Sequence, residues 1–109
     1  FNNSLVGFRE NNIPLIKQFS LKQNYPNPFN PKTSIQFEIP HSSFVDLKVY
    51  DVLGNEISTL LHNVRFDVGQ FSVPFDGTQN SSGIYYYRLT VQEETGNSYS
   101  LVKSMVLQK

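Results

Sequence analysis

The chain has 109 residues, with nine Lys and Arg balanced by nine Asp and Glu, no Cys, and 14% aromatic residues. This length suits one domain with one modest core, and the missing cysteine excludes disulfides, thiolate catalysis and cysteine-ligated metal sites. The balanced charge lacks the basic surface that nucleic-acid binding requires. No apolar run reaches the roughly 18 residues of a membrane span, and no leader opens the sequence, so we expect any export leader to lie upstream.

Residues 1–18 show no regular hydrophobic period and hold four asparagines. Pro14 disfavours helical geometry at Ile13, so this part of the segment is interpreted as a turn. We expect residues 1–18 to be a mobile, protease-sensitive linker or the end of an upstream segment. Residues 19–109 are expected to form the folded domain.

From Phe19 onward, apolar and polar residues alternate, which is the period of half-buried strands. Residues 57–64 are the only stretch where a helix is an alternative. Pro74 cannot donate a ladder hydrogen bond, so it predicts an edge strand or a bulge. Turn residues separate the strands, and Gly54 is expected to have a positive φ. The predicted strands are residues 19–23, 34–40, 45–51, 56–62, 69–77, 83–93 and 99–109. Seven such strands predict an all-β sandwich.

The alternation also predicts which side chains face the core. Tyr50 and Tyr86 fall on the outward parity. In the last strand Leu101, Met105 and Leu107 compete with Val102 and Val106, so we expect either cover on both faces or a bulge. The expected inward residues are Ile35, Phe37, Ile39, Val45, Leu47, Val49, Phe71, Val73, Phe75, Tyr85, Tyr87, Leu89 and Val91.

Three of the six prolines stand in the segment Tyr-Pro-Asn-Pro-Phe-Asn-Pro, residues 25–31, which we call the proline corner. Proline fixes φ and removes a donor, so the loop needs few partners and costs little entropy to order. We expect Tyr25 and Phe29 to fold back as plugs over the open end of the sandwich. The corner would then be a rigid lid, a preformed docking feature, or both.

No set of residues has the pattern of a catalytic or metal site. His41 and His62 are interpreted as solvated loop histidines rather than triad members. Glu93 and Glu94 are expected at a solvated hairpin tip, not as a glycosidase pair. Residues 76–83 are rich in oxygen ligands but hold one carboxylate, which favours a turn over a calcium loop. We therefore predict no catalytic residue, no metal and no cofactor.

Four segments together resemble the type A C-terminal sorting domain of the type IX secretion system. They are residues 24–40, 45–60, 83–89 and 103–109. The resemblance implies an immunoglobulin-like antiparallel β-sandwich and assigns translocon recognition to three motifs. The matching residues are Pro26, Asn27, Pro28 and Phe29 in the proline motif, Tyr50, Asp51, Gly54 and Glu56 in the turn motif, and Lys103, Met105, Val106 and Lys109 in the terminal motif. Many members carry Arg or Lys where this chain has Asn55.

The resemblance further implies a non-catalytic signal on a larger exported protein of a Gram-negative bacterium. An upstream cargo domain, covalently linked, would fold in the periplasm and pass through the outer-membrane translocon. A cell-surface sortase would then anchor or release it. We expect Lys103 and Lys109 to lie in solvent at an exposed strand edge and to form part of the signal. The alternatives are an immunoglobulin-like adhesive or carbohydrate-binding module, or an immunoglobulin-like domain similar to that of flagellar hook-capping proteins.

Overall fold

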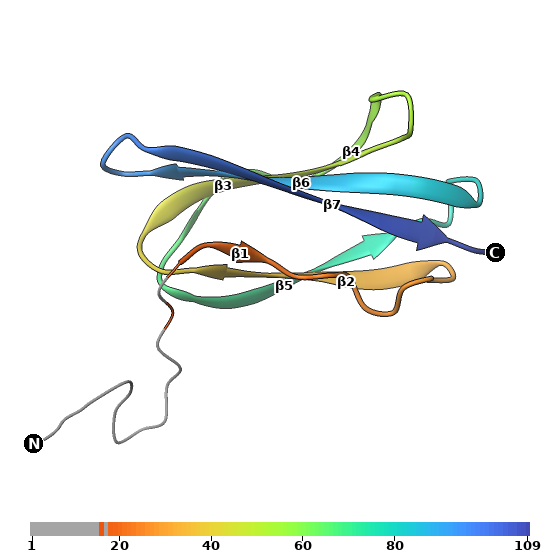
Figure 1. Ribbon diagram of the computed structural model, residues 1–109, viewed down its shortest axis with the longest axis horizontal. Helices are drawn as coiled ribbons and strands as arrows, with labels where there is room; N and C mark the ends of the chain where they lie inside the picture. The colour runs from red at the N-terminus through yellow and green to blue at the C-terminus, as the bar shows by residue number, and fades with distance from the viewer. Residues whose placement is uncertain (1–15, 17) are drawn as a thin grey trace, which may run out of the picture.

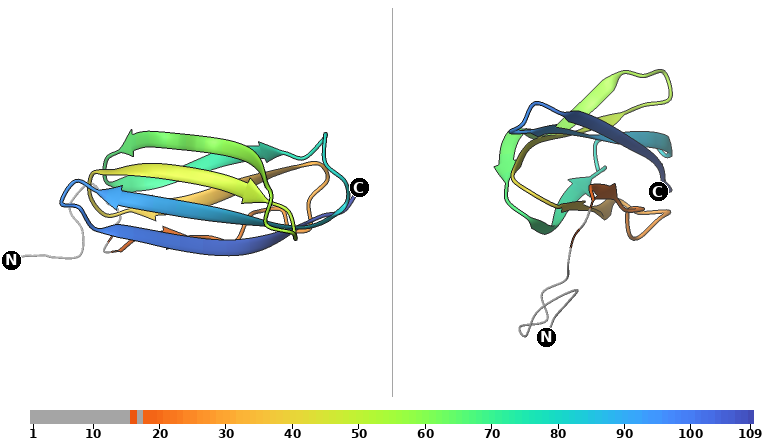
Figure 2. Two further views of the ribbon diagram at one scale, coloured as in Figure 1. Left: turned by 90° about the horizontal axis from the view of Figure 1, so that it is seen from above. Right: turned by 60° about the vertical axis from the view of Figure 1, so that its left-hand side comes forward.

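The computed structural model describes Ile16 and residues 18–109, so the expected linker lies almost wholly outside the described residues. The described part is all-β, with no helical residue, and two antiparallel sheets pack face to face (Figure 1). One sheet has the strand order β1-β2-β5 and the other β4-β3-β6-β7 (Figure 2). The strands are β1 (Ser20–Leu21), β2 (Lys32–Ile39), β3 (Ser43–Tyr50), β4 (Glu56–Phe66), β5 (Gly69–Asp76), β6 (Gly83–Glu93) and β7 (Ser98–Leu107).

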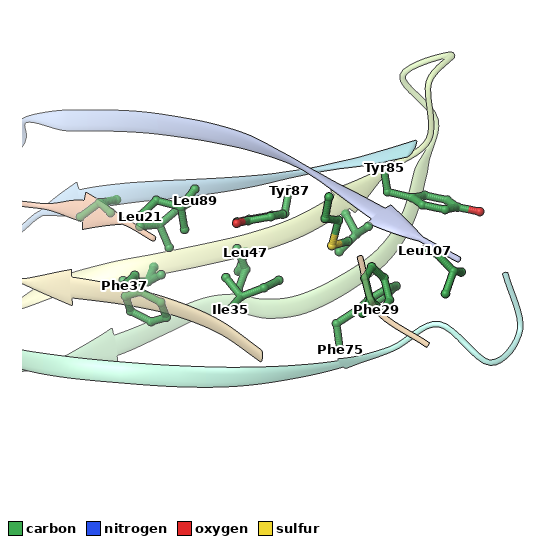
Figure 3. Packing of buried hydrophobic residues seen from close by; sticks show 14 of the residues in the cluster. Leu21, Phe29, Ile35, Phe37, Leu47, Phe75, Tyr85, Tyr87, Leu89 and Leu107 are labelled. Atoms are coloured by element: carbon green, nitrogen blue, oxygen red, sulfur yellow. The ribbon is translucent and has the colours of Figure 1, made fainter. Parts of the chain in front are cut away.

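The hydrophobic core lies between the two sheets and follows the predicted alternation (Figure 3). Strands β2, β3 and β6 bury all of their predicted inward residues. On β5, Phe75 is buried, whereas Phe71 and Val73 are only half-buried. Phe75 is covered by the Phe29 ring, whereas Phe71 and Val73 lie along the open flank of an edge strand. The same edge position explains Pro74, as predicted.

The helix alternative for residues 57–64 is wrong, because these residues belong to strand β4. Its pairing with β3 contains register shifts, and Asn63 adopts a positive φ of 51°. The Asp46 carboxylate accepts the backbone N–H of Asn63 at 3.0 Å and lies 3.1 Å from Nδ1 of His62. A bulge of this kind interrupts the ladder edge and twists the strand.

Strand β7 pairs with β6 from Leu107 to Ser98 without a register shift. Leu101, Lys103, Met105 and Leu107 therefore share the inward parity, while Val102 is 53% exposed. Strand β7 has neither a bulge nor cover on both of its faces, so the prediction that it would have one or the other is wrong. The alternation in β7 was hard to recognise because a charged residue, Lys103, occupies an inward position. On an edge strand, a long lysine side chain can extend from such a position to solvent.

The connections gather at two ends of the sandwich (Figures 1 and 2). The proline corner, the β3–β4 turn (residues 51–55) and the end of β7 lie at the same end of the sandwich, and we call this the motif end. The opposite end, where residue 19 leads into β1, is the far end. There the centroid of the Phe19 ring lies 5.5 Å from that of the His41 ring and 5.1 Å from that of the Tyr99 ring.

The expectation of a solvated Glu93 is wrong. Glu93 is 7% exposed, and its Oε2 lies 2.5 Å from Nε2 of His41. The inward parity of β6 continues to residue 93 and carries this side chain inward, where the His41 ring and the Thr95 hydroxyl supply partners. Glu94, the next residue, is exposed as expected and pairs with Arg65.

Candidate functional site

The proline corner closes the motif end of the core through Phe29. This side chain is 2% exposed, and its ring meets Phe75 edge-on with centroids 6.0 Å apart. Figure 3 shows it next to Phe75 and Leu107. A Cβ atom on Gly77 would lie 3.3 Å from the Phe29 ring and 3.1 Å from Leu107, so the packing leaves no spare room there. The prediction that Phe29 plugs the sandwich is confirmed.

The same prediction is wrong for Tyr25, which is 81% exposed. Its backbone forms a two-way hydrogen-bonded bridge with Ser34, at 3.0 Å in each direction. Successive side chains of an extended segment point to opposite sides, so Asn24, at 2% exposure, takes the inward place instead. A polar side chain therefore lies under the corner where an aromatic plug was expected.

Asn24 belongs to a buried polar network that fixes the start of the corner. Its side-chain amide donates to the carbonyl of Pro26 at 3.1 Å and to Oγ1 of Thr33 at 3.0 Å. Its backbone N–H donates to the Tyr87 hydroxyl at 2.8 Å, and that hydroxyl donates to the carbonyl of Lys22 at 2.8 Å. Burial raises the pKa of Tyr87, which keeps the phenol protonated as a donor.

The corner also covers the free edge of β7. The backbone N–H of Phe29 donates to the carbonyl of Val106, and Gln108 N–H donates to the carbonyl of Phe29, both at 2.9 Å. The Asn27 side chain accepts the backbone N–H of Val106 at 2.9 Å, and Gln23 donates to the carbonyl of Ser104. The expected exposed strand edge is therefore wrong at residues 104–108, because the proline motif occupies it.

The terminal lysines differ in their surroundings. Lys103 is half-buried, whereas Lys109 is exposed and its Nζ donates to the carbonyl of Thr78 at 2.7 Å. Thr78 belongs to the 76–83 loop, where Asp76 accepts the backbone N–H of Thr78 at 2.9 Å. Hydrogen bonds from Thr78 hold the pKa of Asp76 below its ordinary value. The loop is thus built on an Asx turn, and the described residues contain no cluster of three or more potential metal ligands.

The 51–55 turn is held together by its own residues. Oδ1 of Asp51 accepts the backbone N–H groups of Leu53 and Asn55 at 2.9 Å each, and its Oδ2 accepts the Asn55 side chain at 3.1 Å. These donors, the Asn55 side chain first, hold the pKa of Asp51 below its ordinary value. Gly54 has a φ of +86°, as predicted. The Asn55 side chain thus stabilises the turn.

Next to this turn the outer face of the four-stranded sheet carries a shallow groove of about 230 Å³. Tyr50 and Tyr86 line this groove, and the guanidinium carbon of Arg88 lies 4.9 Å from the centroid of the Tyr50 ring. Glu56, at the start of β4, forms an ion pair of 3.4 Å with Lys48 and accepts the Thr59 hydroxyl. The Thr59 bond and the lysine lower the pKa of Glu56, so its carboxylate is ionised at neutral pH.

All three predicted motifs lie at the motif end, but their residues differ in accessibility. Phe29 and Met105 belong to the core, so a partner of the folded domain cannot touch them. The exposed members are Pro26, Asn27, Pro28, Gly54, Glu56 and Lys109, and the half-buried ones are Tyr50, Asp51, Lys103 and Val106. The three motifs together therefore contain residues that support the core and residues that a partner can contact.

Sequence reasoning missed the polar residues that support the corner, namely Gln23, Asn24 and Thr33. The residue types carried a usable signal. Asn and Thr side chains hydrogen-bond nearby backbone groups, and these two flank a segment whose prolines supply no N–H. The carbonyl of Pro26, which both side chains reach, is the kind of acceptor they would be expected to satisfy.

The comparison with protein families decides the assignment. A model described as the secretion system C-terminal sorting domain matches residues 23–106. The chain belongs to this family, the type IX secretion sorting domains. A comparison with curated proteins gave no match. The described part of the chain holds no helix suited in length and apolarity to crossing a membrane.

Membership of the sorting-domain family sets the general role of the chain. It implies a C-terminal sorting signal for type IX secretion, a linked cargo, and export to the surface or the medium of a Gram-negative bacterium. The family is in general non-catalytic. The matched range includes the whole proline corner and the 51–55 turn, together with β7 as far as Val106.

Proposed function

We propose that the motif end is the surface that the outer-membrane translocon of the type IX system recognises in this chain. The observation that carries this proposal is the hydrogen bonding between the proline corner and β7. Asn27 and Val106 are 79 residues apart in sequence, yet one accepts the N–H of the other. Two motifs that are separate in sequence thus form one surface, and such a surface exists only when the domain is folded.

The residues of the three motifs have two kinds of role in this proposal. The exposed residues Pro26, Asn27, Pro28, Gly54, Glu56 and Lys109 make contact with the translocon. Phe29 and Met105 act from the core, because they fix where the proline corner and the end of β7 lie. The half-buried residues contribute both to contact with the translocon and to support of the fold; they are Tyr50, Asp51, Lys103 and Val106.

We also infer that the sandwich is immunoglobulin-like. In the constant-type immunoglobulin arrangement, strands A, B, E and D form one sheet and C, F and G the other. The present order differs in one edge strand, because β4 pairs with β3 instead of β5. The remaining six strands keep the immunoglobulin neighbours, which supports the inference.

In the proposed route, the cargo precedes this domain, passes the inner membrane with a leader and folds in the periplasm. Residue 19 enters the domain at the far end, so a cargo attached upstream leaves the motif end accessible (Figure 1). The translocon then exports the protein, and a cell-surface sortase removes the domain and anchors or releases the cargo. Catalysis by the domain itself has no place in this route.

A secretion assay tests the proposal. A fluorescent reporter with a leader is fused ahead of the full 109-residue chain and expressed in a bacterium with the type IX system and in a mutant without its translocon. We expect export only where the translocon is present, and retention when the chain is omitted. Export that is equal in both strains would contradict the proposal.

A pair of charge variants then tests the motif end itself. Lys109→Gln and Lys22→Gln each remove one positive charge from an exposed residue, but only Lys109 lies in the proposed surface. We expect lower export for Lys109→Gln, normal export for Lys22→Gln, and melting temperatures within the small range usual for surface substitutions. Lys103 is less suitable, because its half-buried stem also packs against the fold.

A further inference from the structure

The 51–55 turn holds two apolar side chains in solvent. Val52 is 64% exposed and Leu53 is 83% exposed. Neither is needed to build the turn, since Asp51 and Asn55 supply its side-chain hydrogen bonds and Gly54 its positive φ. Turn tips are usually polar. Within the described part of the chain, the fold therefore gives no reason for apolar residues at these two positions.

The apolar surface continues from the turn onto the outer face of the four-stranded sheet. Tyr86 is 40% exposed and Val102 53% exposed, and both line the groove with Tyr50 and Val52. We call Tyr50, Val52, Leu53, Tyr86 and Val102 the tip patch. Scattered apolar residues are normal on a protein surface, whereas a contiguous patch marks an interaction site.

The charges around the tip patch indicate what chemistry a partner must supply. Glu56 is paired with Lys48, and the Asp51 carboxylate is used within its own turn. Arg88 stacks on Tyr50, with Nη1 3.5 Å from the Tyr50 hydroxyl, and no carboxylate among the described residues lies within ion-pair distance of it. Tyrosine and arginine are enriched at energetic centres of interfaces, and the guanidinium geometry matches a carboxylate.

We propose that the tip patch docks a protein of the export machinery, which receives Leu53 in an apolar pocket and pairs a carboxylate with Arg88. This inference rests on the proposed function and names the chemistry of the recognised partner. The hydrogen bonds of Asp51 hold the turn in one shape, so little conformational entropy is lost when Leu53 is inserted.

Two other occupants fit the patch less well. A lipid surface is bound by clusters of Lys and Arg beside apolar residues, whereas Arg88 is the only cation of the groove lining. A symmetric dimer through the patch would bring two Arg88 side chains together, and the carboxylates nearby are already engaged. A partner that carries its own carboxylate avoids both difficulties.

The test uses the reporter fused to the full chain, with Leu53→Ser and Arg88→Gln as variants. Val68→Ser is the matched control, because Val68 is an aliphatic residue that is 58% exposed in the connection between β4 and β5. Burial of one leucine changes a dissociation constant by about tenfold or more. We expect export to fall about tenfold for Leu53→Ser, to fall for Arg88→Gln, and to stay normal for Val68→Ser, with unchanged melting temperatures.

Photo-crosslinking identifies the occupant. A benzophenone amino acid at position 53 should link the chain to a component of the type IX machinery, and the same probe at position 68 should not. Normal export of Leu53→Ser would overturn the inference, and so would crosslinks at position 53 only to a second copy. Binding to anionic vesicles that Leu53→Ser abolishes, without a protein crosslink, would also overturn it. The proposed function is tested separately, by the need for the chain and the translocon and by the comparison of Lys109→Gln with Lys22→Gln.

Discussion

The proline corner and the 51–55 turn lie at the same end of the domain but are built in opposite ways. The corner depends on distant parts of the chain: Phe29 packs into the core, Asn24 contacts Tyr87, and the backbone of Phe29 pairs with β7. The turn depends on Asp51, Gly54 and Asn55, all within five residues. One motif therefore forms only when the whole sandwich forms, and the other is set by local geometry.

This difference separates two tasks that a sorting motif can have. A residue such as Phe29 supports the fold, so its loss affects export and stability together. A residue at the tip of the turn can be changed with little effect on the fold, so it reports recognition alone. Substitutions in the two regions should therefore give different combinations of stability and export.

The largest effect is expected for Phe29→Ala. The ring is 2% exposed and contacts Phe75, so truncation leaves a cavity at the end of the core. We expect a loss of about 3–5 kcal/mol in the free energy of unfolding, measured by urea denaturation. A loss below about 1 kcal/mol would mean that the corner is not part of the core.

Tyr87→Phe should have the next largest effect, because it removes one hydroxyl and keeps the ring. The backbone N–H of Asn24 and the carbonyl of Lys22 would lose their partner. We expect a destabilisation of about 1–3 kcal/mol. Tyr86→Phe is the matched control, because that ring lies 40% exposed on the outer face, and it should change stability by less than about 0.5 kcal/mol.

Gly54→Ala should cost about 1 kcal/mol, because an alanine is strained at a φ of +86°. A Cβ at this position has no neighbour within 4 Å, so strain is the only cost. Gly96, with a φ of +108° and the same free space, provides a control in the β6–β7 turn. We expect similar losses of stability from both alanine variants but reduced export only from Gly54→Ala. Equal export would remove the turn from the recognised surface.

The smallest effect is a pH dependence of the 51–55 turn. Hydrogen bonds from Asn55 lower the pKa of Asp51 below its ordinary value in the folded state. The resulting stabilisation is present above the ordinary aspartate pKa of about 3.9 and is lost as the pH falls through the lower, folded-state pKa. The Asn55 backbone amide, followed by NMR, should titrate with a midpoint below the ordinary aspartate pKa, and Asp51→Asn should abolish the titration. A midpoint at or above the ordinary aspartate pKa would contradict this account.

The sequence alone determined the features that depend on short-range patterns. Alternation identified the strands and the inward faces of β2, β3 and β6, because side chains of a strand point to opposite sides whatever lies around it. Turn chemistry identified Gly54, because a positive φ in a tight turn favours glycine. The four motif segments also sufficed to indicate the sorting-domain family.

Only the tertiary structure decided how exposed strand edges and chain ends are satisfied. Sequence patterns do not show that the backbone of Phe29 bonds to Val106 and Gln108, or that Asn24 and not Tyr25 lies beneath the corner. Nor do they show that Glu93 is buried against His41. The physical reason is that an unpaired edge and a buried polar group take whatever partner is nearest in space, and those partners are far away in sequence.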